Sequence, residues 1–157
     1  MVVVGIGKHV ESYDEWRPIR ERDYSPLPLP SQPNSGHAAS FLDFIDTELF
    51  PLVEEDFRVD PDNRTLWGHS LGGAFVLFSL FSKLGLFNRY IATSPALVLE
   101  GVILLDYETG LPTNAHFSEA RLFVSVGSLD HEFGPHVDTF IKIMRDRAYP
   151  ALDFRTT

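Results

Sequence analysis

A polar segment interrupts the apolar run at residues 65–84, which reads TLWGHSLGGAFVLFSLFSKL. Within it, residues 68–72 match the pattern G-x-S-x-G, between a predicted strand and a predicted helix. In that context the serine occupies a sharp, strained turn that lifts its hydroxyl to the carboxyl end of a sheet, where it can attack an acyl carbon. We therefore predict that Ser70 is a nucleophile. The flanking glycines are expected because side chains there would clash with the neighbouring strand and helix.

The helix that follows Ser70 would supply a second element of acyl-transfer chemistry. Its first amide groups have no intrahelical carbonyl partner, so the N–H of Leu71 can donate to the oxyanion of a tetrahedral intermediate. The alternative is a chance match on a glycine-rich turn, which at average composition occurs in roughly one chain of this size in twenty. The strand–turn–helix context and the additional Gly73 favour the catalytic interpretation.

The elements that must position Ser70 are predicted from hydrophobic periodicity. Short apolar runs predict strands at residues 2–6, 65–69, 90–93, 120–128 and 152–157. Spacings of three and four predict helices over residues 41–53, 71–83 and 134–148. Strands that alternate with helices in this way are typical of a mostly parallel sheet with helices on both faces. We therefore expect a single α/β domain over residues 1–157.

Local signals predict where these elements end. Ser35 or Ser40 could cap the first helix, Pro51 marks a kink in it, and Gly85 is a C-cap for the second helix. The segment before the first helix, residues 7–35, is expected to be irregular because its second half is dense in proline and glycine.

Three stretches of the sequence form a recognisable set: DNRTLWGHSLGGAFVLFSLF at 62–81, FNRYIATSPAL at 87–97 and LFVSVGSLDHEF at 122–133. Together they resemble the putative-esterase branch of the α/β-hydrolases, which includes the siderophore (enterobactin-type) esterases. The resemblance implies an α/β-hydrolase-type fold. It also implies a serine hydrolase that acts on carboxylic esters through an acyl-enzyme, with no cofactor. The stretch HEFGPH at 131–136 does not predict a metal site, because its histidines are five residues apart and the zincin motif needs four.

A serine nucleophile needs a histidine to take its proton and a carboxylate to orient that histidine. In α/β-hydrolases the chain order is serine, acid, histidine. Asp130 follows the predicted strand 120–128, and the resemblance implies an acidic residue at its position. We therefore predict Asp130 as the acid, with Glu132 as the second candidate. The alternative is that Asp130 caps a turn or faces solvent.

The histidine is harder to assign, because the resemblance implies a position after the strand at 152–157. The six histidines are His9, His37, His69, His116, His131 and His136. His131 and His136 follow the acid but lie close behind it in the sequence. The run of valines at the amino end reads as a buried strand. The family has further core strands before this position, and the sequence shows none there. We therefore expect an incomplete core and a chain truncated at both ends, in which the hydrolase activity is impaired.

Two further clusters invite a functional interpretation. Trp16 and Tyr24 could line a substrate entrance or simply pack within their loop. Arg20, Arg22 and Asp23 resemble a charged cluster of the family, for which structural ion pairs are favoured over ligand contacts.

The composition excludes several classes of protein. The 157 residues include 13 Lys and Arg and 22 Asp and Glu, a formal net charge of −9. That balance argues against binding to a nucleic-acid backbone or to an anionic membrane surface. The absence of cysteine excludes a disulfide scaffold, a thiolate nucleophile and a cysteine-ligated zinc. No signal peptide and no apolar window of membrane-spanning length is visible, which favours a cytoplasmic location.

The expected partner is a small-molecule ester, and open sheet edges could also support a homo-oligomer. A second hypothesis is a non-catalytic α/β-hydrolase-like module that folds by pairing with another chain. A histidine within hydrogen-bond distance of Ser70 would distinguish the two.

Overall fold

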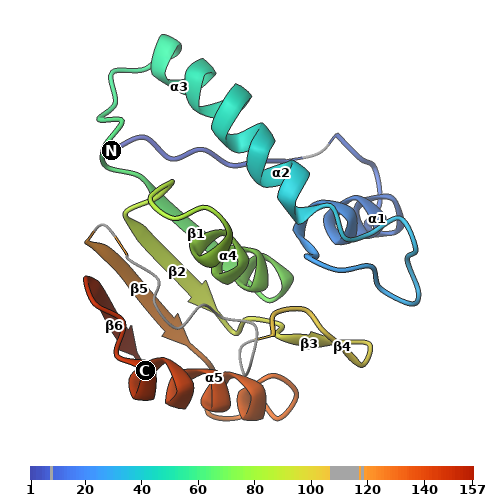
Figure 1. Ribbon diagram of the computed structural model, residues 1–157. Coiled ribbons are helices and arrows are strands. Elements are labelled where there is room, and N and C mark those ends of the chain that lie inside the picture. Colours follow the sequence, from blue (N-terminus) through green and yellow to red (C-terminus); the bar gives the residue numbers. More distant parts are fainter. Residues whose placement is uncertain (8, 107–116, 118) are drawn as a thin grey trace.

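A four-stranded parallel sheet forms the centre of the computed structural model, which describes residues 1–7, 9–106, 117 and 119–157 (Figure 1). Its strands are β1 (Thr65–His69), β2 (Arg89–Thr93), β5 (Ala120–Ser125) and β6 (Leu152–Thr156). They lie in the spatial order β1-β2-β5-β6, and each pairs in parallel with its neighbour. The mostly parallel sheet that the sequence predicted is therefore confirmed.

Four of the helices in the described residues precede the first strand of the sheet, and two lie between its strands. They are α1 (Tyr13–Tyr24), α2 (Ala38–Phe44), the π-helical η1 (Ile45–Leu49), α3 (Phe50–Asp56), α4 (Leu71–Ser82) and α5 (Gly134–Arg147). Helix α4 follows β1 directly and packs on β1 and β2 (Figure 1). Helices α1 and α2 pack on α4. Helix α5 contacts β6. A short antiparallel hairpin, β3 (Val98–Leu99) and β4 (Val102–Ile103), follows β2. No described helix is long and apolar enough to span a membrane.

The hydrophobic core lies on one face of the sheet. In-register pairing places Leu66, Tyr90, Leu122 and Phe154 in one row. This row packs with apolar side chains of α4 and α5, such as Phe140. The adjacent row points to the opposite face and contains Trp67, Ile91 and Phe123. The described core does not include that row, and Trp67 is 66% exposed.

Two predictions for the amino-terminal part of the chain were wrong. Residues 1–7 form no strand, and Val3 is 80% exposed. An apolar run becomes a strand only where a neighbouring strand accepts its hydrogen bonds. The predicted irregular segment contains α1, because Ser12 accepts a hydrogen bond from the backbone N–H of Glu15 and caps the helix. This Ser-x-x-Glu spacing was a recognisable capping signal.

The predicted helix over residues 41–53 forms, but neither proposed serine caps it. His37 is the N-cap of α2. Ser35 instead accepts a hydrogen bond from the N–H of Leu29 in the preceding loop. The predicted disturbance near Pro51 takes the form of the π-helical turn η1, which ends two residues before it. Because proline has no N–H to donate four residues back, a wider turn satisfies the backbone there.

Other element boundaries differ by a few residues. The strand predicted over 120–128 ends at Ser125. Lys83 is the C-cap of α4, and Gly85 lies two residues further on, in a turn with φ of +84°. The β3–β4 hairpin was not predicted, although Gly101 at its tip, with φ of +78°, is a usual hairpin residue.

The core packing predicts the effect of removing a large side chain from α5. Phe140 is fully buried in the core, so Phe140→Ala should lower the free energy of unfolding by about 3–5 kcal/mol. Urea denaturation measures this change. Phe57→Ala is the matched control, because Phe57 is 52% exposed, and should cost far less. Equal losses in the two variants would contradict the packing described.

Candidate active site

Ser70 lies at the turn between β1 and α4, in a conformation that non-glycine residues rarely adopt. Its φ is 57° and its ψ is −122°. The predicted strained strand-to-helix turn is therefore confirmed. Such a conformation costs about 1–3 kcal/mol and persists only where the surroundings over-determine it. The residue is half-buried, and its hydroxyl makes no capping hydrogen bond to α4.

Backbone hydrogen bonds hold Ser70 in this conformation. Its N–H donates to the carbonyl of Thr93 at 3.0 Å. Its carbonyl accepts from the N–H of Ala74 at 3.0 Å and from the N–H of Ala96 at 3.1 Å. Thr93 and Ala96 flank the turn that follows β2, so the neighbouring strand fixes the serine. The sequence carries no signal for these two contacts, because backbone hydrogen bonds do not depend on residue type.

The glycines around Ser70 have different roles. A Cβ on Gly68 would lie 2.2 Å from the carbonyl oxygen of Gly72, so no side chain fits there. A Cβ on Gly73 would lie 3.0 Å from the Cα of Pro95 and 3.1 Å from the carbonyl oxygen of Thr93. At Gly72 a Cβ would meet nothing within 4 Å. The expected clash is therefore confirmed at Gly68, wrong at Gly72, and found instead at Gly73.

The carboxyl edge of the sheet brings Asp130 to the same side as Ser70. Parallel strands end at one edge, and Ser70 follows β1 while Asp130 follows β5, with β2 between them. Asp130 is half-buried in a turn, where its N–H donates to the carbonyl of Gly127 at 2.9 Å. Its Oδ1 accepts from the N–H of Phe133 at 2.9 Å. Asp130 therefore organises the start of α5, which was the structural alternative, and Glu132 is exposed beside it.

Leu71 is the first residue of α4 and is fully buried beside Ser70. Its side chain packs with Leu29, Ala74 and Leu104 in a second small apolar cluster. Its amide belongs to the first turn of the helix, whose N–H groups point towards the carboxyl edge of the sheet. This location is the one that an oxyanion donor requires.

The histidines of the described residues are spread over several elements. His69 is the last residue of β1, His37 caps α2, and His131 is exposed after Asp130. His136 lies in the first turn of α5, and His9 lies near the amino end. His116 lies outside the described residues. In the part of the chain that the structure describes, no hydrogen bond joins a histidine to the Ser70 hydroxyl.

The aromatic and charged residues singled out between positions 16 and 24 make mainly structural contacts. Arg22 Nε lies 2.7 Å from Asp23 Oδ1, so the ion-pair interpretation is confirmed for this pair. The guanidinium of Arg20 lies 5.3 Å from the ring centre of Trp16. Tyr24 packs on the rings of Phe41 and Phe75 in the core. The packing interpretation therefore applies to Tyr24.

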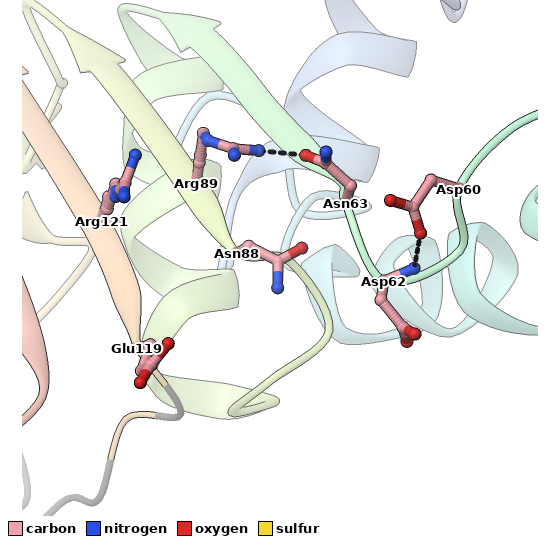
Figure 2. Close-up of a pocket in the computed structure, with 7 residues that line it drawn as sticks. All are labelled: Asp60, Asp62, Asn63, Asn88, Arg89, Glu119 and Arg121. Carbon is pink, nitrogen blue, oxygen red and sulfur yellow. Dashed lines mark hydrogen bonds between the residues drawn. The ribbon is translucent and has the colours of Figure 1, made fainter.

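A polar groove of about 260 Å³ lies at the other end of the sheet (Figure 2). Its lining comprises Asp60, Asp62, Asn63, Asn88, Arg89, Glu119 and Arg121. These residues precede or begin β1, β2 and β5, so they lie at the amino edge, opposite the carboxyl edge that carries Ser70. Arg89 donates to the side-chain oxygen of Asn63 across the groove (Figure 2). The groove is thus separate from the candidate active site.

Comparison with known proteins agrees with this geometry. A family model described as Putative esterase matches residues 1–143. The ferri-bacillibactin esterase BesA of Bacillus subtilis is 38% identical over 107 residues, which cover 61% of this chain and 36% of BesA. The siderophore triacetylfusarinine C esterase of Aspergillus fumigatus is 31% identical over 137 residues, which cover 85% of this chain and 42% of that enzyme. The chain therefore spans about two fifths of the length of these relatives.

A solved structure extends the comparison to the fold. The crystal structure of the BES protein from Bacillus cereus matches with a TM-score of 0.78 and 31% identity. The match covers 90% of this chain and 55% of that protein. The α/β-hydrolase-type fold that the sequence predicted is confirmed.

The close approach at Gly68 predicts a sharp difference between two glycine variants. Gly68→Ala should destabilise the protein by about 1–3 kcal/mol, because the added methyl overlaps the backbone of Gly72. Gly72→Ala is the matched control and should be neutral or stabilising by up to about 1 kcal/mol, since alanine favours the helix. Thermal or urea unfolding of both variants measures the effect. A Gly68→Ala protein as stable as Gly72→Ala would refute the described turn.

Proposed function

Because the chain belongs to the Putative esterase family, we propose that it is a serine carboxylic-ester hydrolase with Ser70 as its nucleophile. The observation that carries this proposal is the conformation of Ser70, with φ of 57° and ψ of −122° between β1 and α4. Residues held in such conformations cluster at active sites and ligand clamps. Here the strain turns the serine out of both the strand and the helix, at the carboxyl edge of the sheet.

The proposed reaction has two steps. The Ser70 Oγ bonds to the ester carbonyl carbon while its proton passes to a histidine, and the Leu71 N–H donates to the oxyanion that forms. The carbonyl re-forms as the alcohol leaves with that proton, which gives an acyl-enzyme. Water then attacks the acyl carbon, the histidine takes its proton, and the acid leaves as Ser70 recovers its hydrogen. No redox agent or cofactor takes part.

We assign the acid of the triad to Asp130, with Glu132 as the alternative. The location of Asp130 after β5, at the edge that carries Ser70, supports this assignment. One carboxylate oxygen orients the turn through Phe133, which leaves the other to orient a histidine. His131 and His136 are the histidines to test first, since both follow Asp130.

For the substrate we propose a small-molecule ester of the siderophore class. The names of BesA and of the Aspergillus fumigatus enzyme both describe siderophore esterases, and this supports the assignment. The net charge of −9 is compatible with a small-molecule substrate and argues against a polyanion.

A second candidate function is a non-catalytic module that pairs with another chain, including a second copy of itself. The observations that favour it are the outer strands β1 and β6 and the exposed Trp67, which lies on the sheet face that the described core does not include. Unpaired strand edges and apolar faces both favour association. Activity of the purified chain separates the two candidates.

The nucleophile assignment predicts that hydrolysis of 4-nitrophenyl acetate depends on Ser70. Ser70→Ala should reduce turnover to the background rate, because alanine has no side-chain oxygen to attack the ester carbon. Ser82→Ala is the matched control, since Ser82 ends the same helix and is exposed, and it should retain wild-type turnover. Turnover that survives in Ser70→Ala would refute the proposal. Absence of turnover in the wild-type chain would favour the non-catalytic module.

The acid assignment predicts different effects for two neighbouring carboxylates. Asp130→Asn should lower kcat by about 10²–10⁴-fold, because the amide cannot stabilise a protonated histidine. Glu132→Gln should change kcat little, because Glu132 is exposed. The reverse order would make Glu132 the acid. His131→Ala and His136→Ala, measured in the same assay, identify a base within this segment.

A further inference from the structure

Glu100, at the tip of the β3–β4 hairpin, joins two segments that are distant in the sequence. Its Oε2 accepts the N–H of Ser31 at 2.9 Å, and its Oε1 accepts the hydroxyl of Ser31 at 2.5 Å. Arg17 Nη2 of α1 also lies 3.3 Å from Oε1. These contacts span 69 and 83 residues of sequence. We call them the Glu100 clamp.

Local backbone preference does not explain a glutamate at this position. Glu100 has a φ of +52° and is followed by Gly101 with a φ of +78°. Tight hairpin turns with two positive φ angles favour asparagine, aspartate or glycine at both positions. A longer acidic side chain in a disfavoured backbone conformation therefore points to a role in its long-range contacts.

The proline-rich loop (residues 25–36), which contains Ser31, contacts the first turn of α4. Its Leu29 is 1% exposed and packs with Leu71, Ala74 and Leu104. Internal hydrogen bonds stiffen the loop, for example from the N–H of Leu29 to the Ser35 hydroxyl at 2.6 Å. The loop is thus a defined wall beside the proposed oxyanion donor.

The hairpin has its other anchor at the serine itself. The N–H of Ala96 donates to the carbonyl of Ser70 at 3.1 Å, just before the hairpin begins. The N–H of Leu104 donates to the carbonyl of Leu97 at 2.8 Å and closes the hairpin base. One end of this unit is therefore bonded to Ser70 and the other, through Glu100, to the loop and α1.

We propose that Glu100 is a positioning residue of the esterase site, which fixes the hairpin and the proline-rich loop together as one wall beside Ser70 and thereby sets the affinity for the ester. This role rests on the proposed function. Hydrogen bonds from Ser31 and the charge of Arg17 hold the pKa of Glu100 below its ordinary value, so the carboxylate is charged at neutral pH. In the described part of the chain neither Glu100 nor Ser31 contacts the Ser70 hydroxyl, so the chemical step and kcat should not depend on them. Their effect is instead on KM, through the wall that binds the ester.

The test is Glu100→Gln in the full chain, assayed with 4-nitrophenyl acetate and with the longer 4-nitrophenyl butyrate. The amide keeps the size of the side chain but loses its charge and one acceptor oxygen. We expect KM to rise about 2- to 10-fold, the effect of one weakened hydrogen-bonded contact, with kcat within about 2-fold of wild type. The control is Glu55→Gln on α3, an exposed glutamate outside the clamp, which should leave both constants unchanged.

A double-mutant cycle shows whether Glu100 acts through Ser31. Ser31→Ala should raise KM in the same way, and the double variant should raise it no further than either single variant. Independent, multiplicative effects would overturn the clamp, as would an unchanged KM in Glu100→Gln. A fall in kcat with an unchanged KM would also overturn it.

Amide hydrogen exchange tests the clamp without a measurement of enzymatic activity. Glu100→Gln should accelerate exchange across residues 29–35, while amides of β5 keep wild-type protection. Unchanged exchange in the loop would overturn the clamp and leave the proposed function intact. Absence of Ser70-dependent turnover in the wild-type chain would instead refute the proposed function, and the positioning role with it.

Discussion

The strained backbone of Ser70 is the constraint on which the rest of the site depends. A conformation with φ of 57° and ψ of −122° is unfavourable for any residue with a side chain, so the surroundings must stabilise it. Three backbone hydrogen bonds do so, one to Thr93 at the end of β2 and one to Ala96 in the turn after it. Gly68 and Gly73 allow the close approach of α4, β1 and the turn after β2 that these bonds require. The local sequence and the neighbouring strand therefore specify one geometry together.

Parallel topology explains why the chemically relevant residues gather at one edge. Each strand of the sheet ends on the same side, so the segments after β1, β2 and β5 meet there although they are far apart in the sequence. The amino edge collects a different set, the arginines and carboxylates of the polar groove. The β3–β4 hairpin extends from the carboxyl edge and connects Ser70 to the proline-rich loop through Glu100. Helix α4, the hairpin and the loop are thus connected to one another and lie around the serine.

The structural elements that depend only on local sequence pattern were predicted from the sequence. The strand over 65–69, the buried helix after it and the turn at Ser70 needed only periodicity and the G-x-S-x-G spacing. Val2 to Val4 show the limit, because the same apolar run is a strand or an exposed segment according to whether a partner strand lies beside it. The cap at Ser12 was present in the sequence as a Ser-x-x-Glu signal. The Glu100 clamp was not predictable, because its partners lie 69 and 83 residues away and share no periodicity with it.

The most direct test of the central claim is to treat the purified chain with diisopropyl fluorophosphate and map the adduct by peptide mass spectrometry. An activated serine oxygen displaces fluoride and forms a stable phosphoester, whereas an ordinary serine does not react. The account predicts a single adduct on the peptide that contains Ser70, lost in Ser70→Ala. An unmodified Ser70, or an adduct on another serine that persists in Ser70→Ala, would contradict it.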